Sequence, residues 1–100
     1  MIFAGDVYLA DVNDERRLRV LVISNDRFTI VSGRVLVAPE IAVEPGEVLF
    51  PWRVVVGDLD TAAYAIDLAR SLPSGRLLDR VDRVPAATMA AVRRVLLTIT

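Results

Sequence analysis

Residues 20–27 read VLVISNDR, an apolar run that ends abruptly in four polar residues. Three of the four apolar residues are β-branched, and a run with no polar alternation is typical of a strand buried on both faces. We expect this strand over residues 19–24. Residues 25–33 carry turn-forming side chains and predict an irregular connection or a short helical turn.

Outward from this run, the chain contains further strand patterns separated by turn residues. Proline cannot donate to a sheet ladder, so Pro51 bends a long strand or places it at an edge. Residues 71–75, which include Pro73, predict a break. The remaining expected strands are 6–12, 34–39, 47–56 and 63–67, with 77–81 as a short strand or a turn of helix.

After Pro85 the hydrophobic period changes from that of a strand to that of a helix. Met89, Val92, Leu96 and Ile99 recur at helical spacing, and proline suits the first helical position. We therefore predict one domain over residues 1–100 of the α+β class, mainly β. It would be a small barrel of strongly bent antiparallel strands with a C-terminal amphipathic helix.

The composition limits the chemistry that this chain can perform. It has no Cys and no His, which removes thiolate chemistry, the usual zinc ligands and the common neutral-pH base. Catalysis would depend on arginine, carboxylates, hydroxyls or backbone groups, and we expect no cofactor and no metal. All 12 basic residues are arginine, the side chain best suited to bidentate phosphate contacts, although the net charge is −1.

The chain is also unusually apolar for its length. Hydrophobic residues make up 54% of it, and a fold of 100 residues cannot bury them all. An exposed apolar face predicts a homodimer or another bound partner. No apolar run is long enough to span a membrane, and the N-terminus reaches Asp6 without a secretory signal pattern, so we expect a cytoplasmic protein.

Three patches, GDVY at 5–8, VLVISNDR at 20–27 and VLVAP at 35–39, stand in the order found in the MazF/PemK toxins. The chain resembles this family over nearly its whole length, since residues 67–72 and 76–89 also fit. The resemblance implies a barrel of the SH3-like kind, a homodimer and a cognate antitoxin whose acidic tail blocks the active groove. It further implies cleavage of single-stranded RNA without a metal.

The chain departs from the family pattern at the groove. Leu18 and Ile41 stand where the family has an arginine and a threonine, and Leu68 stands where it has a glutamine. A slip of one residue would let Arg19, or the flanking Arg17, act as the catalytic cation. Because side chains alternate across a strand, such a slip sends the guanidinium to the opposite face unless the strand entrance absorbs the shift.

The resemblance also implies which other residues line the groove. RNA cleavage through the ribose 2′-hydroxyl needs a cation over the phosphate as charge accumulates, a task for which arginine is well suited. Asp67 with Arg70 is either a pair within the site or a structural salt bridge. The expected RNA-binding residues are Ser24, Arg27, Asp67 and Arg70.

A second resemblance points to another target. Residues 33–39, 49–51, 57–58 and 67–69 are similar to the CcdB toxins, which share the fold and poison DNA gyrase. Those toxins end in a tryptophan-containing tip, whereas this chain ends Leu97, Thr98, Ile99, Thr100. A gyrase poison is therefore the alternative to a nuclease, and a binding module without activity is the third possibility.

Overall fold

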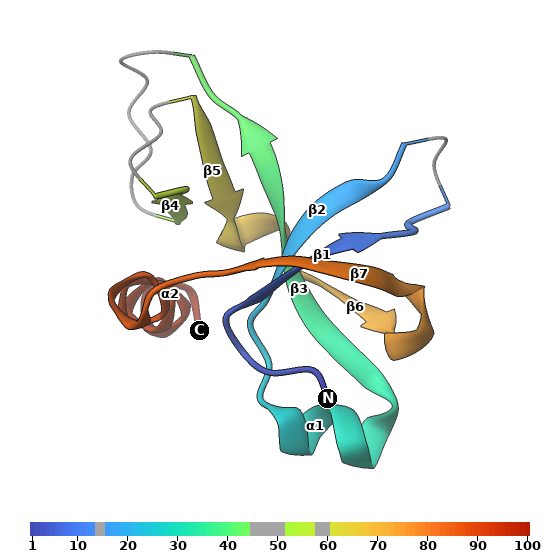
Figure 1. Ribbon diagram of the computed structural model, residues 1–100. Helices are drawn as coiled ribbons and strands as arrows, with labels where there is room; N and C mark the ends of the chain where they lie inside the picture. The colour runs from blue at the N-terminus through green and yellow to red at the C-terminus, as the bar shows by residue number, and fades with distance from the viewer. Residues whose placement is uncertain (14–15, 45–51, 58–60) are drawn as a thin grey trace.

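The computed structural model describes residues 1–13, 16–44, 52–57 and 61–100, and within them strands dominate (Figure 1). Two helices accompany the strands, together with two short 3₁₀ turns, η1 (Ile66–Leu68) and η2 (Ser74–Arg76). The longer elements are β1 (Asp6–Ala10), β2 (Leu18–Val22), α1 (Asp26–Ser32), β3 (Arg34–Ala42), β4 (Arg53–Val55), β5 (Ala62–Ala65), β6 (Arg70–Pro73), β7 (Leu77–Arg83) and α2 (Ala86–Ile99).

The strands pair antiparallel in the order β4-β5-β3-β2-β1-β7. β3 is the centre of this sheet: one edge pairs with β2, while the other pairs with β6 along its first half and with β5 along its last residues. Among the described strands, β4 and β7 end the order and do not pair with each other. The prediction of a mainly β fold of strongly bent antiparallel strands with a C-terminal helix is confirmed, and the sheet stays open.

Strand alternation gives the sheet two apolar faces, each with its own core. On one face β2 contributes Leu21, and α2 covers the cluster with Met89 and Val92. On the other face β2 contributes Val20 and Val22, and the bent strands enclose the cluster themselves. The whole second cluster is Ala10, Val20, Val22, Val35, Val37 and Leu72.

The N-terminal segment is fixed to β7 through Asp6, whose side chain is fully buried. Its Oδ2 accepts a hydrogen bond from the Phe3 backbone N–H at 2.9 Å, and its Oδ1 lies 3.7 Å from guanidinium nitrogens of both Arg80 and Arg83. Gly5, at φ +95°, lets the chain turn directly before β1. A buried carboxylate is costly unless it is paired, so these arginines stabilise the turn.

α1 forms because both of its ends are capped. The Asn25 side chain accepts a hydrogen bond from the Phe28 N–H at 2.8 Å, and Gly33 closes the helix in the left-handed conformation at φ 70°. The expected short helical turn is thus present over Asp26–Ser32. None of its side chains is fully buried, and the helix projects beyond the ends of β2 and β3 (Figure 1).

The structure corrects several of the expected elements. The strand expected over 63–67 ends at Ala65 and continues as η1, and the strand expected over 34–39 runs on to Ala42. The break expected over residues 71–75 is in part a strand, because β6 pairs with the first half of β3 and ends at Pro73. β7 is a full strand of seven residues, longer than expected. Most of the expected strand over 47–56 lies outside the described residues. Its described part contains β4, and only this strand can be compared with the prediction. Within the described part of the chain, no helix is long and apolar enough to cross a membrane.

Candidate functional site

The paired strands β2 and β3 carry two neighbouring pairs of residues that point to opposite faces. The register pairs Val20 with Pro39, so the next position places Arg19 opposite Glu40, and the one after it places Leu18 opposite Ile41. Leu18 packs against the cluster around Val20. Leu18 and Ile41, at the family's arginine and threonine positions, therefore form an apolar pair. The neighbouring residues Arg19 and Glu40 form an ion pair on the other face.

Arg19 is held firmly on that face. Its Nε donates to Oε2 of Glu40 at 2.6 Å, and Glu40 in turn lies opposite Tyr64 of β5. The hydrogen bond to Glu40 raises the pKa of Arg19, and desolvation opposes the rise. Tyr64 belongs to the cluster under α2, so Glu40 and Arg19 lie on the α2 side of the sheet. Arg19 therefore points away from the face of Leu18, and the backbone at the start of β2 does not bring it back.

Tyr64 forms the buried wall behind this ion pair. Burial raises the pKa of its hydroxyl, the charge of Glu40 raises it further, and Arg19 lowers it. The phenol is therefore neutral at physiological pH, and it interacts with the Arg19 guanidinium as an uncharged hydroxyl. Arg19 is thus positioned from two sides, by a carboxylate and by a phenol.

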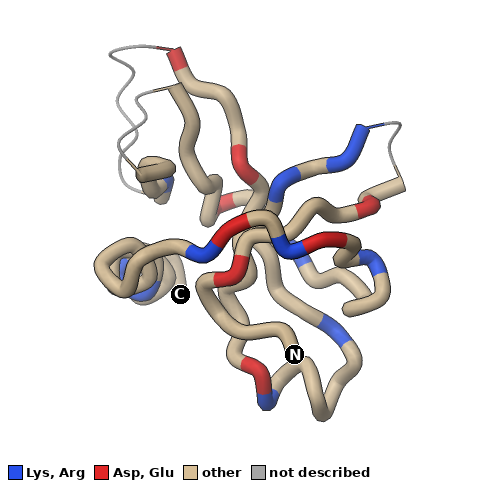
Figure 2. The backbone as a smooth tube through the Cα atoms, viewed as in Figure 1, with Lys and Arg blue, Asp and Glu red and all other residues tan. Residues whose placement is uncertain are grey.

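A cavity of about 290 Å³ opens beside the Arg19–Glu40 pair. Two guanidiniums, one carboxylate and the hydroxyl-bearing Thr61 lie on its wall. Figure 2 shows a basic position on β2 near an acidic position on β3, the place of the Arg19–Glu40 hydrogen bond. The full lining is Arg17, Arg19, Glu40, Ile41, Ala42, Thr61 and Ala62.

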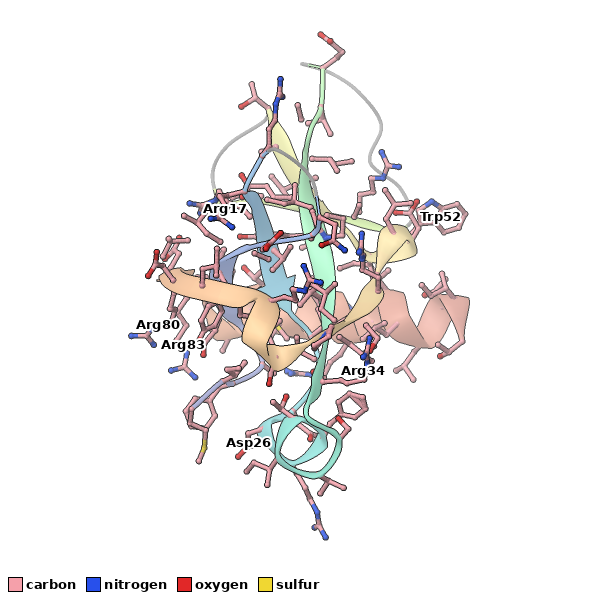
Figure 3. All side chains as sticks on the ribbon, turned by 90° about the vertical axis from the view of Figure 1, so that its right-hand side faces the viewer. Arg17, Asp26, Arg34, Trp52, Arg80 and Arg83 are labelled. Atoms are coloured by element: carbon pink, nitrogen blue, oxygen red, sulfur yellow. The ribbon has the colours of Figure 1, made fainter. Side chains whose placement is uncertain are left out.

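Arg17 is the less restrained of the two arginines. One of its guanidinium nitrogens lies 3.9 Å from Oδ2 of Asp11, and its side chain is 59% exposed. Asp11 also lies 3.6 Å from the Arg76 guanidinium. Figure 3 shows Arg17 at the end of the sheet opposite α1, far from Arg34. Its guanidinium can therefore turn toward a phosphate entering the cavity.

The other four expected RNA-binding residues do not line this cavity. Ser24 is buried, and its Oγ accepts a hydrogen bond from the Leu36 N–H at 3.0 Å, so its hydroxyl holds the start of α1 to β3. Arg27 is exposed on α1, and Arg70 is exposed on β6. Asp67 lies 3.4 Å from Arg53, so its ion pair joins η1 to β4.

A larger hollow of about 700 Å³ lies between β4 and α2. Arg53 and Arg94 are the charged residues on its wall, and the rest is aliphatic or hydroxyl-bearing. Its lining, in the part of the chain that the structure describes, includes no carboxylate that could act as an acid–base group in RNA cleavage. The smaller cavity is therefore the better candidate for a reacting centre.

Three residues of the site were not singled out in the sequence: Glu40, Thr61 and Tyr64. Glu40 carried a usable signal, since it is the one carboxylate in β3 and stands between Pro39 and Ile41, and such a residue needs a cationic partner. Thr61 and Tyr64 reach the site through the pairing of β5 with β3, which no local pattern reveals. Within the described residues, no group of three His, Cys, Asp or Glu side chains could hold a metal ion.

Comparisons with solved structures agree on the fold. A mycobacterial endoribonuclease in complex with its cognate antitoxin superposes with a TM-score of 0.77 at 23% identity, covering 97% of this chain and 90% of that one. MazF in a MazE–MazF crystal from Deinococcus radiodurans gives 0.77 at 25% identity, with 98% and 94% covered. The Mycobacterium tuberculosis toxin MazF-mt6 gives 0.68 at 14% identity, with 93% of each chain covered.

Among curated proteins, none matches the sequence significantly. A family model does match, and its match runs over residues 3–100, which includes every strand and both helices. Its description is a PemK-like, MazF-like toxin of the type II toxin–antitoxin system. This chain therefore belongs to the PemK/MazF toxin family.

Proposed function

We propose that this chain is an endoribonuclease toxin that cleaves single-stranded RNA without a metal ion. The observation that supports the proposal is the cavity in which Arg17 and Arg19 meet a carboxylate and a hydroxyl-bearing residue. Two guanidiniums on one small cavity match the needs of a phosphodiester, whose charge grows as its phosphorus is attacked. In a chain without histidine, this arrangement supplies the electrostatic part of the reaction.

The two arginines would have different roles. Arg19 is fixed by Glu40 at 2.6 Å, so it needs little reorganisation when charge develops on a phosphate oxygen. Arg17 is exposed and loosely paired, so it can follow the RNA backbone and hold a neighbouring phosphate. Binding by such contacts weakens steeply with added salt.

The toxin would act in the cytoplasm as a homodimer that a cognate antitoxin inhibits. Exposed apolar side chains on both helices, among them Val31 on α1 and Leu97 on α2 at 80% each, support contact with a partner chain. Two of the solved structures with this fold are described as complexes of an endoribonuclease or MazF with an antitoxin. The antitoxin would cover the RNA-binding surface.

The direct test is incubation of the purified protein with single-stranded RNA in EDTA. We expect cleavage that Arg19→Ala slows by about 100-fold or more, as the loss of a charge-stabilising donor does in other enzymes. Arg93→Ala, which removes an exposed arginine from α2, is the matched control and should cleave at the wild-type rate. Intact RNA at high protein concentration, with inhibited DNA supercoiling by gyrase, would replace this proposal by the CcdB-like alternative.

A further inference from the structure

Among the described residues that line the cavity of Arg17 and Arg19, Glu40 is the one carboxylate. Its side chain is 18% exposed and is flanked along β3 by Pro39 and Ile41. A carboxylate in such surroundings is costly to desolvate, and a hydrophobic residue would pack there without that cost. Its place beside a cavity, and not within either core, gives it access to a bound molecule.

Charged and titratable groups face Glu40 from several elements. Arg19 of β2 donates to it, Tyr64 of β5 lies opposite it, and Arg17 precedes β2 on the same cavity. Asp82 of β7 lies close enough to influence the pKa values of both Arg19 and Tyr64. Arg19 is the direct partner of the Glu40 carboxylate, and an ionised carboxylate is the form that can accept a proton.

The register of β2 and β3 places the Arg19–Glu40 pair one step from an apolar pair. Positions 18 and 41, where the family has polar residues, are apolar here and lie opposite each other. Positions 19 and 40 are one step along the same ladder and carry a cation and a carboxylate. Compared with the family pattern, the polar residues stand one position later on β2 and one position earlier on β3. They therefore still lie opposite each other, but on the other face of the sheet.

We propose that Glu40 is the general base of the cleavage reaction, an inference that rests on the RNA cleavage proposed above. Glu40 takes the proton of the ribose 2′-hydroxyl as the 2′-oxygen attacks phosphorus. The bond from phosphorus to the 2′-oxygen forms, and the bond to the 5′-oxygen of the next nucleotide breaks. The leaving oxygen takes a proton from water, so the products are a 2′,3′-cyclic phosphate and a 5′-hydroxyl.

Asp67 is the other carboxylate considered for this groove, and its surroundings differ. It lies on η1 in an ion pair with Arg53, outside the cavity that Arg17 and Arg19 share. A base must reach the proton that it abstracts within hydrogen-bond distance. Glu40 is already in direct contact with Arg19, and its carboxylate is therefore next to any phosphate that Arg19 binds.

The test compares single-turnover cleavage of one RNA oligonucleotide by the wild-type protein and by Glu40→Gln across a range of roughly pH 4 to 9. We expect the wild-type rate to rise about tenfold per pH unit on the acidic limb, and Glu40→Gln to lose this rise and at least about 100-fold in rate. RNA binding by fluorescence anisotropy should be unchanged or tighter, since the variant removes a negative charge. Asp26→Asn removes the same charge from α1, far from Arg17 in Figure 3, and should keep the wild-type profile.

The outcomes separate this inference from the function on which it rests. A wild-type protein that leaves RNA intact overturns the proposed nuclease, and the general base with it. Cleavage by Glu40→Gln within about threefold of wild type, with the same acidic limb, overturns the general base and leaves the nuclease standing. If thermal melting shows Glu40→Gln to be unfolded, Glu40→Asp decides: an acidic limb at a lower rate supports the base, and a pH-independent rate overturns it.

Discussion

The two faces of the β2–β3 ladder are built from alternate residues of the same strands and yet carry different chemistry. On one face Leu18, Val20 and Val22 contribute to an apolar core that the bent strands enclose. On the other face Leu21 enters the core under α2, and Arg19 forms an ion pair at the edge of that core. The comparison shows that one step along a strand decides whether a polar residue meets a core or a cavity.

The largest expected effect comes from a cavity in the core under α2, which packs against the face of Arg19 and Glu40. Leu21→Ala should lower the free energy of unfolding by about 2–5 kcal/mol, because Leu21 is fully buried and the strands around it cannot collapse into the space. Urea unfolding monitored by circular dichroism measures the change. Arg93→Ala, at an exposed position of α2, is the control and should cost less than about 0.5 kcal/mol. A loss below about 1 kcal/mol for Leu21→Ala would show that this face is not close-packed.

The contact between β1 and α2 offers a second way to disturb the same core. Gly5→Ala should cost about 1–3 kcal/mol, because the φ of +95° is strained for any other residue and the new Cβ would lie 3.3 Å from Met89 Cγ. Thermal unfolding measures the effect. Gly33→Ala shares the positive φ but meets no atom within 4 Å, so the difference between the two variants isolates the packing against Met89. Equal losses would assign the whole cost to the backbone.

The apolar face can be tested for function at the position where the family has an arginine. Leu18→Ala should cost about 1–2 kcal/mol of stability, because Leu18 is half-buried against the core around Val20. The rate of RNA cleavage should stay within about twofold of wild type, since the reacting cavity does not include this side chain. Measurement of both quantities on one preparation sharpens the contrast with Arg19→Ala. A large loss of cleavage with the fold intact would assign the reaction to the face of Leu18.

Strands with a clear local pattern were predictable from the sequence, and those defined by distant pairing were not. The apolar run before Ser24 and the helical period after Pro85 both describe elements of the structure, β2 and α2. β6 was not predicted because its residues stand among turn-formers and become a strand only by pairing with the first half of β3. Local propensity cannot report a partner that lies more than 30 residues away in the chain.

The candidate site divides in the same way. Arg17 and Arg19 were predicted from the resemblance and a slip of one residue, and the structure brings both to one cavity. The partner of Arg19 was missed, because Glu40 meets it only across the β2–β3 ladder. Ser24 stays a predicted RNA-binding residue, and its hydroxyl accepts a hydrogen bond from the Leu36 N–H. The fate of a polar side chain depends on which backbone groups the fold leaves in need of a partner.

The smallest expected effect concerns the wall behind the ion pair. Burial raises the pKa of Tyr64 above its ordinary value of 10.0, so above about pH 10 the unfolded chain loses this proton before the folded one does. The unfolded state then binds fewer protons, and the stability present below pH 10 falls as the pH rises through the folded pKa. Tyr64→Phe removes this titration, so its stability should fall less between about pH 9 and 11 in urea unfolding.

Tyr8 is the matched control, because burial first and Asp6 second also raise its pKa while it lies away from the Arg19–Glu40 pair. Tyr8→Phe should likewise flatten the alkaline fall in stability, but it should leave RNA cleavage as in the wild type. Tyr64→Phe should in addition lower the cleavage rate slightly, because the phenol helps to hold the Arg19 guanidinium. Identical alkaline unfolding of Tyr64→Phe and the wild type would show that the hydroxyl is open to water. In that case the charged face would be held by Glu40 alone.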